Sequence, residues 1–578
     1  MTTKFNIPDE FIHGFLQSGQ SLWESFTKTY GTQLVSDASQ TGLSQFPAAS
    51  NSGAMAELQM RYYQQQIALW MGMLARATGQ SPEPVVTPEK GDRRFSGADW
   101  RDNPYFDLLK QSYLINARLI GDMVETVDVD EKTRDKLRFY SRQYINSMSP
   151  ANFAATNPDV LKLALETQGE SVKAGFNNLI EYIRKGRISI TDESAFEVGK
   201  NVAVSEGAVV FENDLIQLIQ YAPLTEKVAQ RPLLIIPPCI NKFYILDLQP
   251  ENSFVCYAGE QGNTVFLISW RNTPPELGHI TWDDYLRDGA MKAIEVALEI
   301  SGADKLNALG WCVGGTILSS ALAVMRGRGE DSVASLTLFT AMLDFRDPGD
   351  LGVFIDEEGV RAREQAIGKG GIYPGQELAF VFQTLRANDL IWPNVVNNYL
   401  KGKSPEAFDL LYWNADSTNL PGPMYSWYLR NMYLENNLRV PNKLTMCGVP
   451  LDLGKIDMPS YVLATQEDHI VPWISAYRST QLLGGESQFV LGASGHIAGV
   501  INPPSKNKRS YWMNGETGED TDRWLATAES MPGSWWPNWS QWLKPKAGEQ
   551  VAARTQLGSD RYQVIEPAPG RYVKARSD

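Results

Sequence analysis

Short apolar runs mark the second half of the chain. Six of them, rich in β-branched residues, occur in PLLIIPP, NTVFLISW, KLNALGW, SLTLFTA, PSYVLATQ and SQFVLG, and most are followed by a helical or turn-rich stretch. Apolar runs of this length that alternate with helical stretches are typical of parallel strands covered on both faces. The pattern therefore predicts an α/β domain with a mostly parallel sheet, which we place at residues 193–578.

The first third of the chain shows a helical pattern instead. Residues 55–79 carry apolar side chains at helical spacing and end at Gly79, a residue type common at helix C-caps. A connector with three prolines follows, and helical patterns resume at Tyr105 and continue to about Lys185. We predict a helical N-terminal domain over residues 1–192. Its first part, residues 1–55, is rich in Ser, Gln, Gly and Ala and is expected to be mobile.

A stripe of Met, Tyr and Trp side chains runs along the helical pattern near Trp70. It fits two interpretations, a face for a membrane or polymer surface and a face that packs within the helical domain. Packing is the more common fate of such a stripe, so the sequence favours packing.

A long insertion separates two of the predicted strands. About 110 residues lie between SLTLFTAML and MPSYVLATQ, far more than one crossover helix requires. The segment is rich in aromatic residues and proline, as in LLYWNADSTNLPGPMYSWYLRNMY. We expect it to form a cap, or lid, over the strand ends, at about residues 345–455.

Composition and charge exclude several classes of function. The formal net charge of −14 and the absence of a run of Lys and Arg argue against nucleic acid as a partner. The four cysteines are far apart, without zinc-ligand spacing, so neither a metal site nor a disulfide framework is expected. The N-terminus does not resemble a signal peptide, and no segment has the roughly eighteen apolar residues of a membrane span. We expect a cytoplasmic protein without a transmembrane segment.

The strongest chemical signal is the stretch GWCVGG around Cys312. A strand that leads into Gly-x-Cys-x-Gly and then into a helix has the arrangement of a nucleophile elbow, which indicates an α/β-hydrolase fold. Glycine at positions 310 and 314 fits a turn too tight for bulkier residues. The backbone N–H of Val313 would face a developing oxyanion, and the helix N-terminus would favour a thiolate. The alternative is a buried structural cysteine in a glycine-rich turn.

The candidate base is His496, in FVLGASGHIAGV just beyond the last predicted strand. This is where α/β-hydrolase folds deliver their base. The other histidines are weaker candidates: His13 lies in the predicted mobile start, His279 precedes a helix, and His469 follows directly after the candidate acid. His469 could line the pocket or contact substrate, and it could equally be a packing residue.

The acid of this fold lies between nucleophile and base in the chain. Asp468 ends the strand-like SYVLATQED and is favoured, because a carboxylate there can accept the imidazole N–H and fix its tautomer. Asp344, at the end of SLTLFTAML, is the alternative. A second oxyanion N–H is expected after PLLIIPP, at Cys239 or Ile240. Cys256 and Cys447 are expected to be inert.

A thiol nucleophile favours one reaction class. Cysteine exchanges acyl groups well with thioesters, because one thioester replaces another at almost no net change in free energy. The sequence therefore favours an acyltransferase fed by an acyl thioester, with a cysteine hydrolase as the alternative.

Several longer motifs point to one family. GWCVGG, PPCINKFYILDLQPENSFV, QEDHIVPW, SGHIAGVINPP and DRRFSGADWRDNPYFDLLKQSYL resemble the class I polyhydroxyalkanoate synthases, over about residues 90–545. The resemblance implies polymerisation of (R)-3-hydroxyacyl-coenzyme A into polyester, with coenzyme A as leaving group and no further cofactor. It places the nucleophile on Cys312, the base on His496 and the acid on Asp468, with oxyanion donors at Val313 and Ile240.

The resemblance also implies partners. Similar enzymes dimerise through the cap and act on the growing granule, so a homodimer, a polyester granule surface and granule-associated proteins are expected partners. By matching position, Arg386 would meet coenzyme A phosphates and Trp413 would serve the cap or dimer contact, although an ordinary helix residue and a core aromatic are equally expected.

One residue departs from the family pattern: Trp311 stands where relatives usually carry Phe or Tyr, which puts the shape of the pocket wall and hence the monomer preference in question. CVGG in place of CSGG favours short monomers such as 3-hydroxybutyryl-coenzyme A. A Cys thioesterase or esterase of the same fold and a non-catalytic granule-surface protein are the competing interpretations.

Overall fold

The computed structural model describes residues 52–577 of the chain. The start that the sequence predicts to be mobile, with His13, lies almost entirely outside the described residues. The chain divides into two compact units, residues 1–190 with 386–406 and residues 191–385 with 407–578. No helix within residues 52–577 is both long and apolar enough to cross a membrane.

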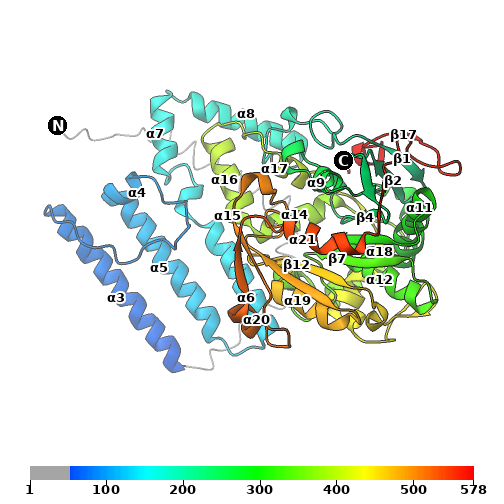
Figure 1. The fold of residues 1–578 in the computed structure, drawn as a ribbon. Helices are drawn as coiled ribbons and strands as arrows, with labels where there is room; N and C mark the ends of the chain where they lie inside the picture. Colours follow the sequence, from blue (N-terminus) through cyan, green and yellow to red (C-terminus); the bar gives the residue numbers. More distant parts are fainter. Residues whose placement is uncertain (1–51, 578) are drawn as a thin grey trace. The chain divides into compact units, whose positions relative to one another are not determined.

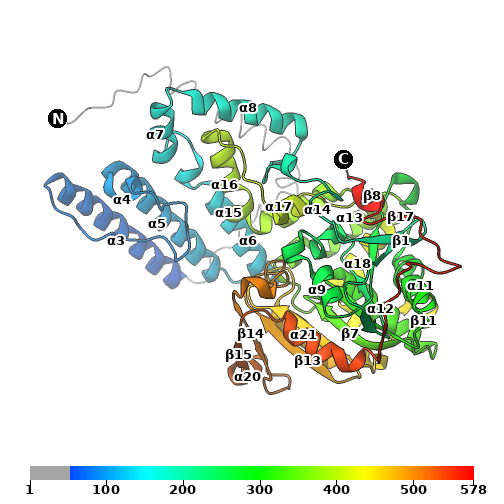
Figure 2. The ribbon, with the colours of Figure 1, turned by 45° about the horizontal axis from the view of Figure 1, so that its top comes forward.

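The described part of the first unit is helical and contains no strand (Figures 1 and 2). Its main helices begin at side-chain caps: Asn103 accepts from the N–H of Tyr105, and Asp130 accepts from the N–H of Thr133. The helices are α3 (Ser52–Ala77), α4 (Asp99–Asp102), α5 (Pro104–Thr126), α6 (Glu131–Ser147), α7 (Pro158–Glu166), α8 (Glu170–Lys185), α15 (Ala387–Leu390), α16 (Trp392–Asn394) and η9 (Val395–Leu400). The predicted helix over residues 55–79 is thus confirmed as α3.

Residues 386–406 belong to this helical unit although they fall within the predicted cap. The amide of Asn178 donates to the carbonyl of Asn398 at 2.9 Å, and Lys401 pairs with Asp159 at 3.2 Å. These partners are more than 200 residues apart in sequence, with separations of 220 and 242. Sequence patterns do not report contacts of this kind.

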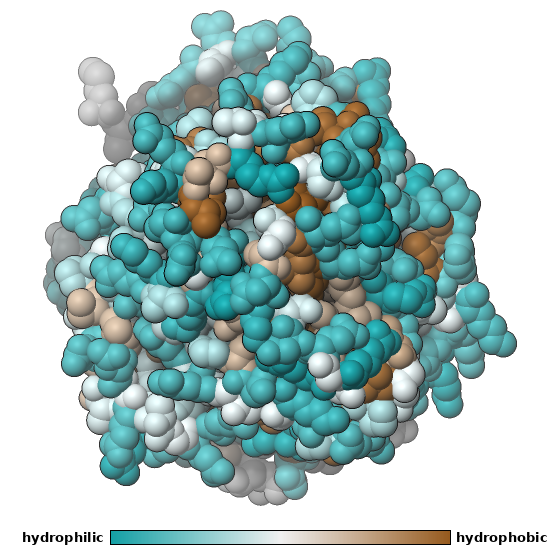
Figure 3. Space-filling model, turned by 45° about the vertical axis from the view of Figure 1, so that its right-hand side comes forward, coloured by the Kyte–Doolittle hydropathy of each residue, from teal (hydrophilic) through white to brown (hydrophobic). Residues whose placement is uncertain are grey.

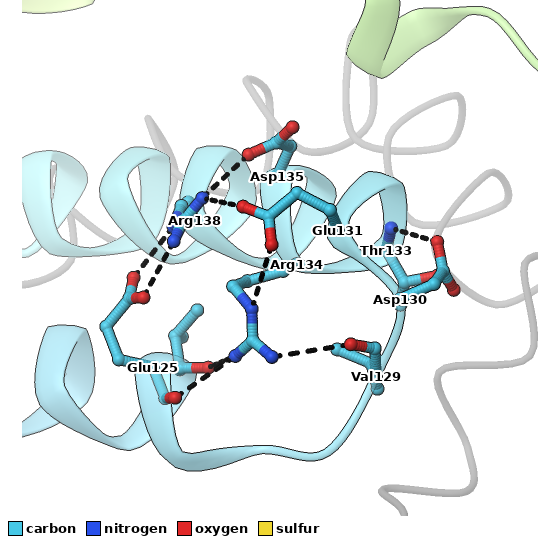
Figure 4. Close-up of polar contacts among 9 residues, drawn as sticks. Glu125, Val129, Asp130, Glu131, Thr133, Arg134, Asp135 and Arg138 are labelled. Carbon is cyan, nitrogen blue, oxygen red and sulfur yellow. Dashed lines mark hydrogen bonds and ion pairs between the residues drawn. The ribbon is translucent and has the colours of Figure 1, made fainter.

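A charged network fixes the turn between α5 and α6 (Figure 4). Arg138 contacts three carboxylates, Glu125 and Glu131 at 2.7 Å and Asp135 at 2.9 Å, and Arg134 donates to backbone carbonyls of the turn. These side chains are largely exposed, and water and salt screen ion pairs between exposed groups. The network sets the local geometry of the turn and contributes little to overall stability.

The stripe near Trp70 is exposed. Its side chains show relative exposures of 60–65%, and they are Met60, Tyr63, Ile67, Trp70, Met71 and Leu74. The opposite side of α3 buries Leu58 and Leu69 and contacts α5. The packing interpretation therefore holds for the leucine side of the helix and is wrong for the stripe. We call these six residues the α3 stripe.

The second unit is built on one sheet of eleven strands, in the order β15-β14-β13-β12-β7-β6-β4-β5-β2-β1-β17. The six central strands, from β13 to β5, pair in parallel, and the strands outside them are antiparallel. The parallel strands are β4 (Leu233–Ile236), β5 (Val265–Trp270), β6 (Leu306–Trp311), β7 (Val333–Phe339), β12 (Ser460–Thr465) and β13 (Ser487–Gly492). All six predicted strand runs are thereby confirmed, and so is the α/β class.

The antiparallel strands of this sheet are β1 (Gly207–Glu212), β2 (Ile216–Tyr221), β14 (Ser510–Met513), β15 (Glu529–Pro532) and β17 (Glu566–Pro567). Three two-stranded ribbons lie outside it, formed by β3 (Lys227–Ala229) with β16 (Gln550–Ala552), β8 (Ile372–Tyr373) with β9 (Leu420–Pro421), and β10 (Thr445–Met446) with β11 (Val449–Pro450).

Both faces of the central sheet are buried. Along β4, Leu234 and Ile236 join one apolar cluster and Leu233 and Ile235 join the other. Because successive strand side chains point to opposite faces, this alternation places one cluster on each face of the sheet. Helices that pack against it include α9 (Phe254–Glu260), α11 (Lys292–Ser301), α12 (Val313–Gly327), α19 (Trp473–Ser479) and α21 (Trp536–Leu543).

The insertion between β7 and β12 is mostly helical and also contains the short strands β8 to β11. Its parts that belong to the second unit include η8 (Gly349–Phe354), α13 (Glu357–Ile367), α14 (Gly375–Leu385), α17 (Asp409–Asn414), α18 (Gly422–Tyr428) and the π-helix η10 (Leu429–Leu434).

Hydrophilic residues cover most of the face drawn in Figure 3, with hydrophobic residues in small groups among them.

Candidate active site

Cys312 occupies the turn between β6 and α12. Its backbone has φ 52° and ψ −129°, a conformation that is strained for a residue with a side chain and is typical of a functional turn. Two hydrogen bonds hold it: its N–H donates to the carbonyl of Phe339 at 2.9 Å, and its carbonyl accepts from the N–H of Gly315 at 2.9 Å. The turn presents a half-buried thiol at the start of a helix.

Glycine is required on both sides of this turn. A Cβ on Gly310 would stand 2.5 Å from the Cα of Gly315, and a Cβ on Gly314 would overlap the backbone carbonyl oxygens of Ile236 and Pro237. The steric reason for the Gly-x-Cys-x-Gly pattern is therefore confirmed. β4 and α12 approach so closely here that no side chain fits between them.

His496 and Asp468 lie together, as the sequence predicts. Nδ1 of His496 is 2.7 Å from Oδ2 of Asp468, and the side chains expose 6% and 0% of their surface. The other carboxylate oxygen accepts from the N–H groups of Ile470 and Val471, each at 2.9 Å. These bonds fix the carboxylate, and the carboxylate fixes the imidazole ring.

Cys312 is among the groups that interact electrostatically with the imidazole. Burial lowers the pKa of His496, while the charge and hydrogen bond of Asp468 and the interactions with Cys312 raise it, and the net result is a pKa raised to about 10. The protonated form of the imidazole is therefore favoured. Thiol, imidazole and carboxylate stand in the order that nucleophilic acyl transfer needs.

The alternative acid, Asp344, makes other contacts. It is buried after β7, where it accepts from the amide of Asn436 at 2.8 Å and from the N–H of Arg346 at 2.9 Å. It thus ties the end of β7 to the insertion, whereas Asp468 holds His496.

The two predicted oxyanion donors, Val313 and Ile240, lie at the start of α12 and in the loop after β4. Val313 begins α12, and the first N–H groups of a helix have no partner within the helix. Ile240 follows β4, and its carbonyl accepts from the N–H of Thr418 at 2.9 Å, which ties this loop to the insertion. Cys239 beside it is 1% exposed, and burial raises the pKa of its thiol, so it stays protonated.

His469 and Trp311 differ in their surroundings. His469 is half-buried, and its carbonyl accepts from the N–H of Asp350 at 3.2 Å, so the loop of the acid contacts the start of the insertion. Trp311 is 1% exposed within a core cluster, and its indole N–H donates to Thr340 at 2.9 Å. A pocket role for Trp311 would have to act through the packing of the turn.

Arg386 and Trp413 lie in different units. Arg386 belongs to the first unit, is half exposed and pairs with Asp389 at 2.8 Å. Trp413 belongs to the second unit, is 5% exposed, and donates its indole N–H to the carbonyl of Lys242 at 2.6 Å. The burial of Trp413 is that of a core aromatic.

The remaining cysteines and His279 make local contacts. Cys256 lies 3.1 Å from the hydroxyl of Ser205, Cys447 lies 3.5 Å from the carbonyl of Asp283, and the exposed His279 contacts the carbonyl of Glu276 at 3.2 Å. Within residues 52–577, no three His, Cys, Asp or Glu side chains are grouped as metal ligands would be.

The sequence did not single out two tyrosines, Tyr428 and Tyr433, whose electrostatic neighbours include Cys312. They lie in the aromatic stretch of the insertion. Their only sequence signal is that composition, because no motif marks them.

The parallel sheet, the strained elbow and the imidazole–carboxylate pair define an α/β-hydrolase-fold protein. A model of the alpha/beta hydrolase fold matches residues 232–503, and a model described as the N-terminus of poly-beta-hydroxybutyrate polymerase matches residues 91–258. The chain belongs to the poly(3-hydroxyalkanoate) polymerase family and is an acyltransferase-type enzyme.

The curated relatives support this assignment over nearly the whole chain. A poly(3-hydroxyalkanoate) polymerase subunit of Cupriavidus necator is 55% identical over 90% of this chain and 89% of its own length. A poly(3-hydroxyalkanoate) polymerase of Methylorubrum extorquens is 45% identical over 90% of this chain and 87% of its own. Among solved structures, a hydrolase of Pseudomonas aeruginosa is 16% identical with a TM-score of 0.32, covering 52% of this chain and 95% of that one.

Proposed function

We propose that this enzyme polymerises short (R)-3-hydroxyacyl-coenzyme A, mainly 3-hydroxybutyryl-coenzyme A, into polyhydroxyalkanoate and releases coenzyme A. Cys312 is the nucleophile, His496 the general base and Asp468 the acid that orients it. The observation that carries the proposal is the strained elbow at Cys312 together with the imidazole of His496, which Asp468 holds at 2.7 Å.

In the first step, the thiolate of Cys312 attacks the carbonyl carbon of the substrate thioester. The backbone N–H groups of Val313 and Ile240 stabilise the tetrahedral oxyanion. The bond to the sulfur of coenzyme A then breaks, and the imidazolium of His496 gives its proton to the leaving thiolate. The acyl group is left on Cys312 as a new thioester.

In the second step, a substrate hydroxyl attacks that thioester. His496 takes the hydroxyl proton, the ester bond forms, and the bond between the acyl carbon and the sulfur of Cys312 breaks. Asp468 stabilises the imidazolium that forms. Water would react in the same way as the hydroxyl, and we infer that the insertion over the strand ends excludes it.

The proposed substrate has one further support. Val313 follows Cys312 directly, and CVGG resembles the short-chain members of the family. No cofactor is needed, because coenzyme A enters with the substrate and leaves as product.

A polyester granule is the proposed partner surface. The α3 stripe presents six large apolar side chains, each at least 60% exposed, along one helix of 26 residues. An apolar stripe of this kind stabilises binding to an apolar surface in proportion to the area buried. We place the enzyme in the cytoplasm on the granule surface, as a homodimer with granule-associated proteins as further partners.

The main competitor is a thioesterase or esterase that uses the same three residues but transfers the acyl group to water. Purified enzyme incubated with 3-hydroxybutyryl-coenzyme A separates the two functions, with Cys312→Ala as the matched control. The proposal expects coenzyme A release together with insoluble polyester that the control does not form. Release of free 3-hydroxybutyrate without polyester would show a hydrolase, and equal polymer accumulation with the control would show a non-catalytic surface protein.

A further inference from the structure

Two tyrosines of the insertion stand on one irregular helix. Tyr428 is the last residue of α18, and Tyr433 lies in the π-helix η10 that continues it. A π-helical turn is uncommon and is frequently found at functional sites, because it changes the direction in which side chains leave the helix. Tyr428 and Tyr433 face each other edge to face, with ring centroids 5.3 Å apart.

Aromatic contacts hold both rings. Phe345 packs against Tyr433 with centroids 5.0 Å apart, and Trp282 stacks on Tyr428 at 5.2 Å. Phe345 belongs to the loop after β7, and its N–H donates to the side chain of Asn436 at 2.8 Å. The rings are thus fixed from two sides, by the loop after β7 and by the helix α10 (Trp282–Asp284).

The loop that carries Phe345 also borders the nucleophile. Thr316 of the first turn of α12 donates to the carbonyl of Met342 at 3.0 Å. A Cβ on Gly315 would stand 2.5 Å from the Cβ of Ala341. A continuous line of contacts therefore connects the turn at Cys312 with the ring of Tyr433.

The two phenols share the surroundings of the nucleophile. Tyr428 and Tyr433 interact with each other, and each also has Cys312 among its electrostatic neighbours. Burial, followed by the nearby charges of Cys312 and Asp468, raises the pKa of Tyr433. The phenol of Tyr433 therefore keeps its proton and can donate a hydrogen bond.

Acyl transfer itself does not need a hydrogen bond from the hydroxyl of Tyr433. The oxyanion has its own donors, and His496 is held by Asp468 and Cys312. A 3-hydroxyacyl substrate brings one more oxygen, two carbons beyond the thioester carbonyl, that a plain acyl thioester lacks. Sites that hydrogen-bond a substrate hydroxyl discriminate strongly against analogues without it.

We propose that Tyr433 is a specificity-determining residue, which donates a hydrogen bond to the 3-hydroxyl oxygen of the substrate whose thioester faces Cys312. Tyr428 is the positioning residue that orients it. The inference rests on the proposed function for its substrate. It explains how the site distinguishes hydroxyacyl from plain acyl thioesters before any ester bond forms.

The test is a double-mutant-type cycle, in which the hydroxyl of Tyr433, the 3-hydroxyl of the substrate, or both are removed. Single-turnover release of coenzyme A is measured for wild type and Tyr433→Phe, each with 3-hydroxybutyryl- and butyryl-coenzyme A. Loss of one hydrogen-bond partner lowers the rate by about tenfold, within a range of about 5- to 150-fold. We expect that loss when either hydroxyl is absent and little further loss when both are absent. Equal loss on both substrates, or no loss on either, would overturn the inference.

Two further variants serve as a second test and as a control. Tyr428→Phe should show a smaller loss, confined to 3-hydroxybutyryl-coenzyme A, and it serves as the second test if Tyr433→Phe does not fold. Tyr373→Phe is the matched control, because Tyr373 is also a buried phenol of the insertion, stacked on Tyr425 with centroids 4.2 Å apart. It should change neither rate by more than about twofold. Release of coenzyme A is common to polymerases and thioesterases, so failure to form polymer would leave this test intact.

Discussion

Asp468 lies 2.7 Å from the ring of His496, whereas the other candidate acid, Asp344, is bound to Asn436 at 2.8 Å. The two carboxylates end neighbouring strands of the sheet, and only Asp468 holds the imidazole. We therefore expect Asp468→Asn to lower the rate of polymerisation by about 10³- to 10⁴-fold, because an amide leaves the imidazole in the wrong tautomer and its cation without a counter-charge.

Asp344→Asn is the matched control for this prediction. It removes the same charge at a buried carboxylate and should keep activity within about tenfold, with its main effect on thermal stability. Both variants are compared by initial rates of coenzyme A release and by the unfolding midpoint. Full activity of Asp468→Asn together with loss of activity in Asp344→Asn would reverse the assignment of the acid.

The nucleophile makes the simplest prediction. Cys312→Ala should abolish polymer formation and leave the fold intact, because alanine keeps the Cβ and fits the same turn. Cys447→Ala serves as control, since Cys447 is also half-buried and stands, like Cys312, at a positive φ, 48° against 52°. Mass spectrometry after a short incubation with substrate should find an acyl group on the control and none on Cys312→Ala. An acyl group elsewhere on the latter would contradict the prediction.

The pH dependence of stability follows from His496, whose pKa rises from its usual 6.5 to about 10 in the folded protein. The folded state binds this proton more tightly than the unfolded state does. The stabilisation is therefore complete below about pH 6.5 and is lost as the pH rises towards 10. Chemical denaturation of wild type and His496→Gln between pH 6 and 10 should show a stability difference that shrinks with rising pH. A difference that grows with pH would contradict the prediction.

The parallel sheet could be predicted because its strands are buried on both faces and therefore appear as continuous apolar runs. The elbow could be predicted because the close approach of β4 and α12 permits only glycine at position 314. Outer strands were not among the predicted runs. β15 (Glu529–Pro532) is exposed along its whole length, so no burial pattern marks it.

Tertiary contacts account for what the sequence did not show. Residues 386–406 join the helical unit through partners such as Asn178, and nothing in a local pattern reports such a partner. The same holds for Tyr433, whose ring is held by a π-helix and by the loop that carries Phe345. Exposure of the α3 stripe is a third case, since a helical period shows that a face is apolar and does not show what covers it.

The elbow glycine offers a test of the packing itself. Gly314→Ala places a methyl group against the carbonyl oxygens of Ile236 and Pro237, which are backbone atoms at the end of β4 and just after it and cannot move aside alone. We expect a loss of about 1–3 kcal/mol in the free energy of unfolding and a strong loss of activity, because the turn at Cys312 must shift. Gly121→Ala is the control: its Cβ meets nothing within 4 Å in α5, and alanine should be neutral or stabilising there. Equal stability of both variants would show that the turn tolerates a side chain.

The α3 stripe predicts binding to polyester that is separable from catalysis. Ile67, Met71 and Leu74 expose 63%, 63% and 62% of their surface and lie on one side of the helix. Burying each side chain fully on an apolar surface would contribute about 1.5–3 kcal/mol, so replacing all three with Gln should weaken binding to poly(3-hydroxybutyrate) particles by at least 100-fold. Co-sedimentation measures the binding, and coenzyme A release from soluble substrate should stay within about twofold of wild type. Ala68→Gln, an exposed position of the same helix outside the stripe, should leave both unchanged. If the triple variant sediments with the particles as wild type does, the enzyme binds polyester through another surface.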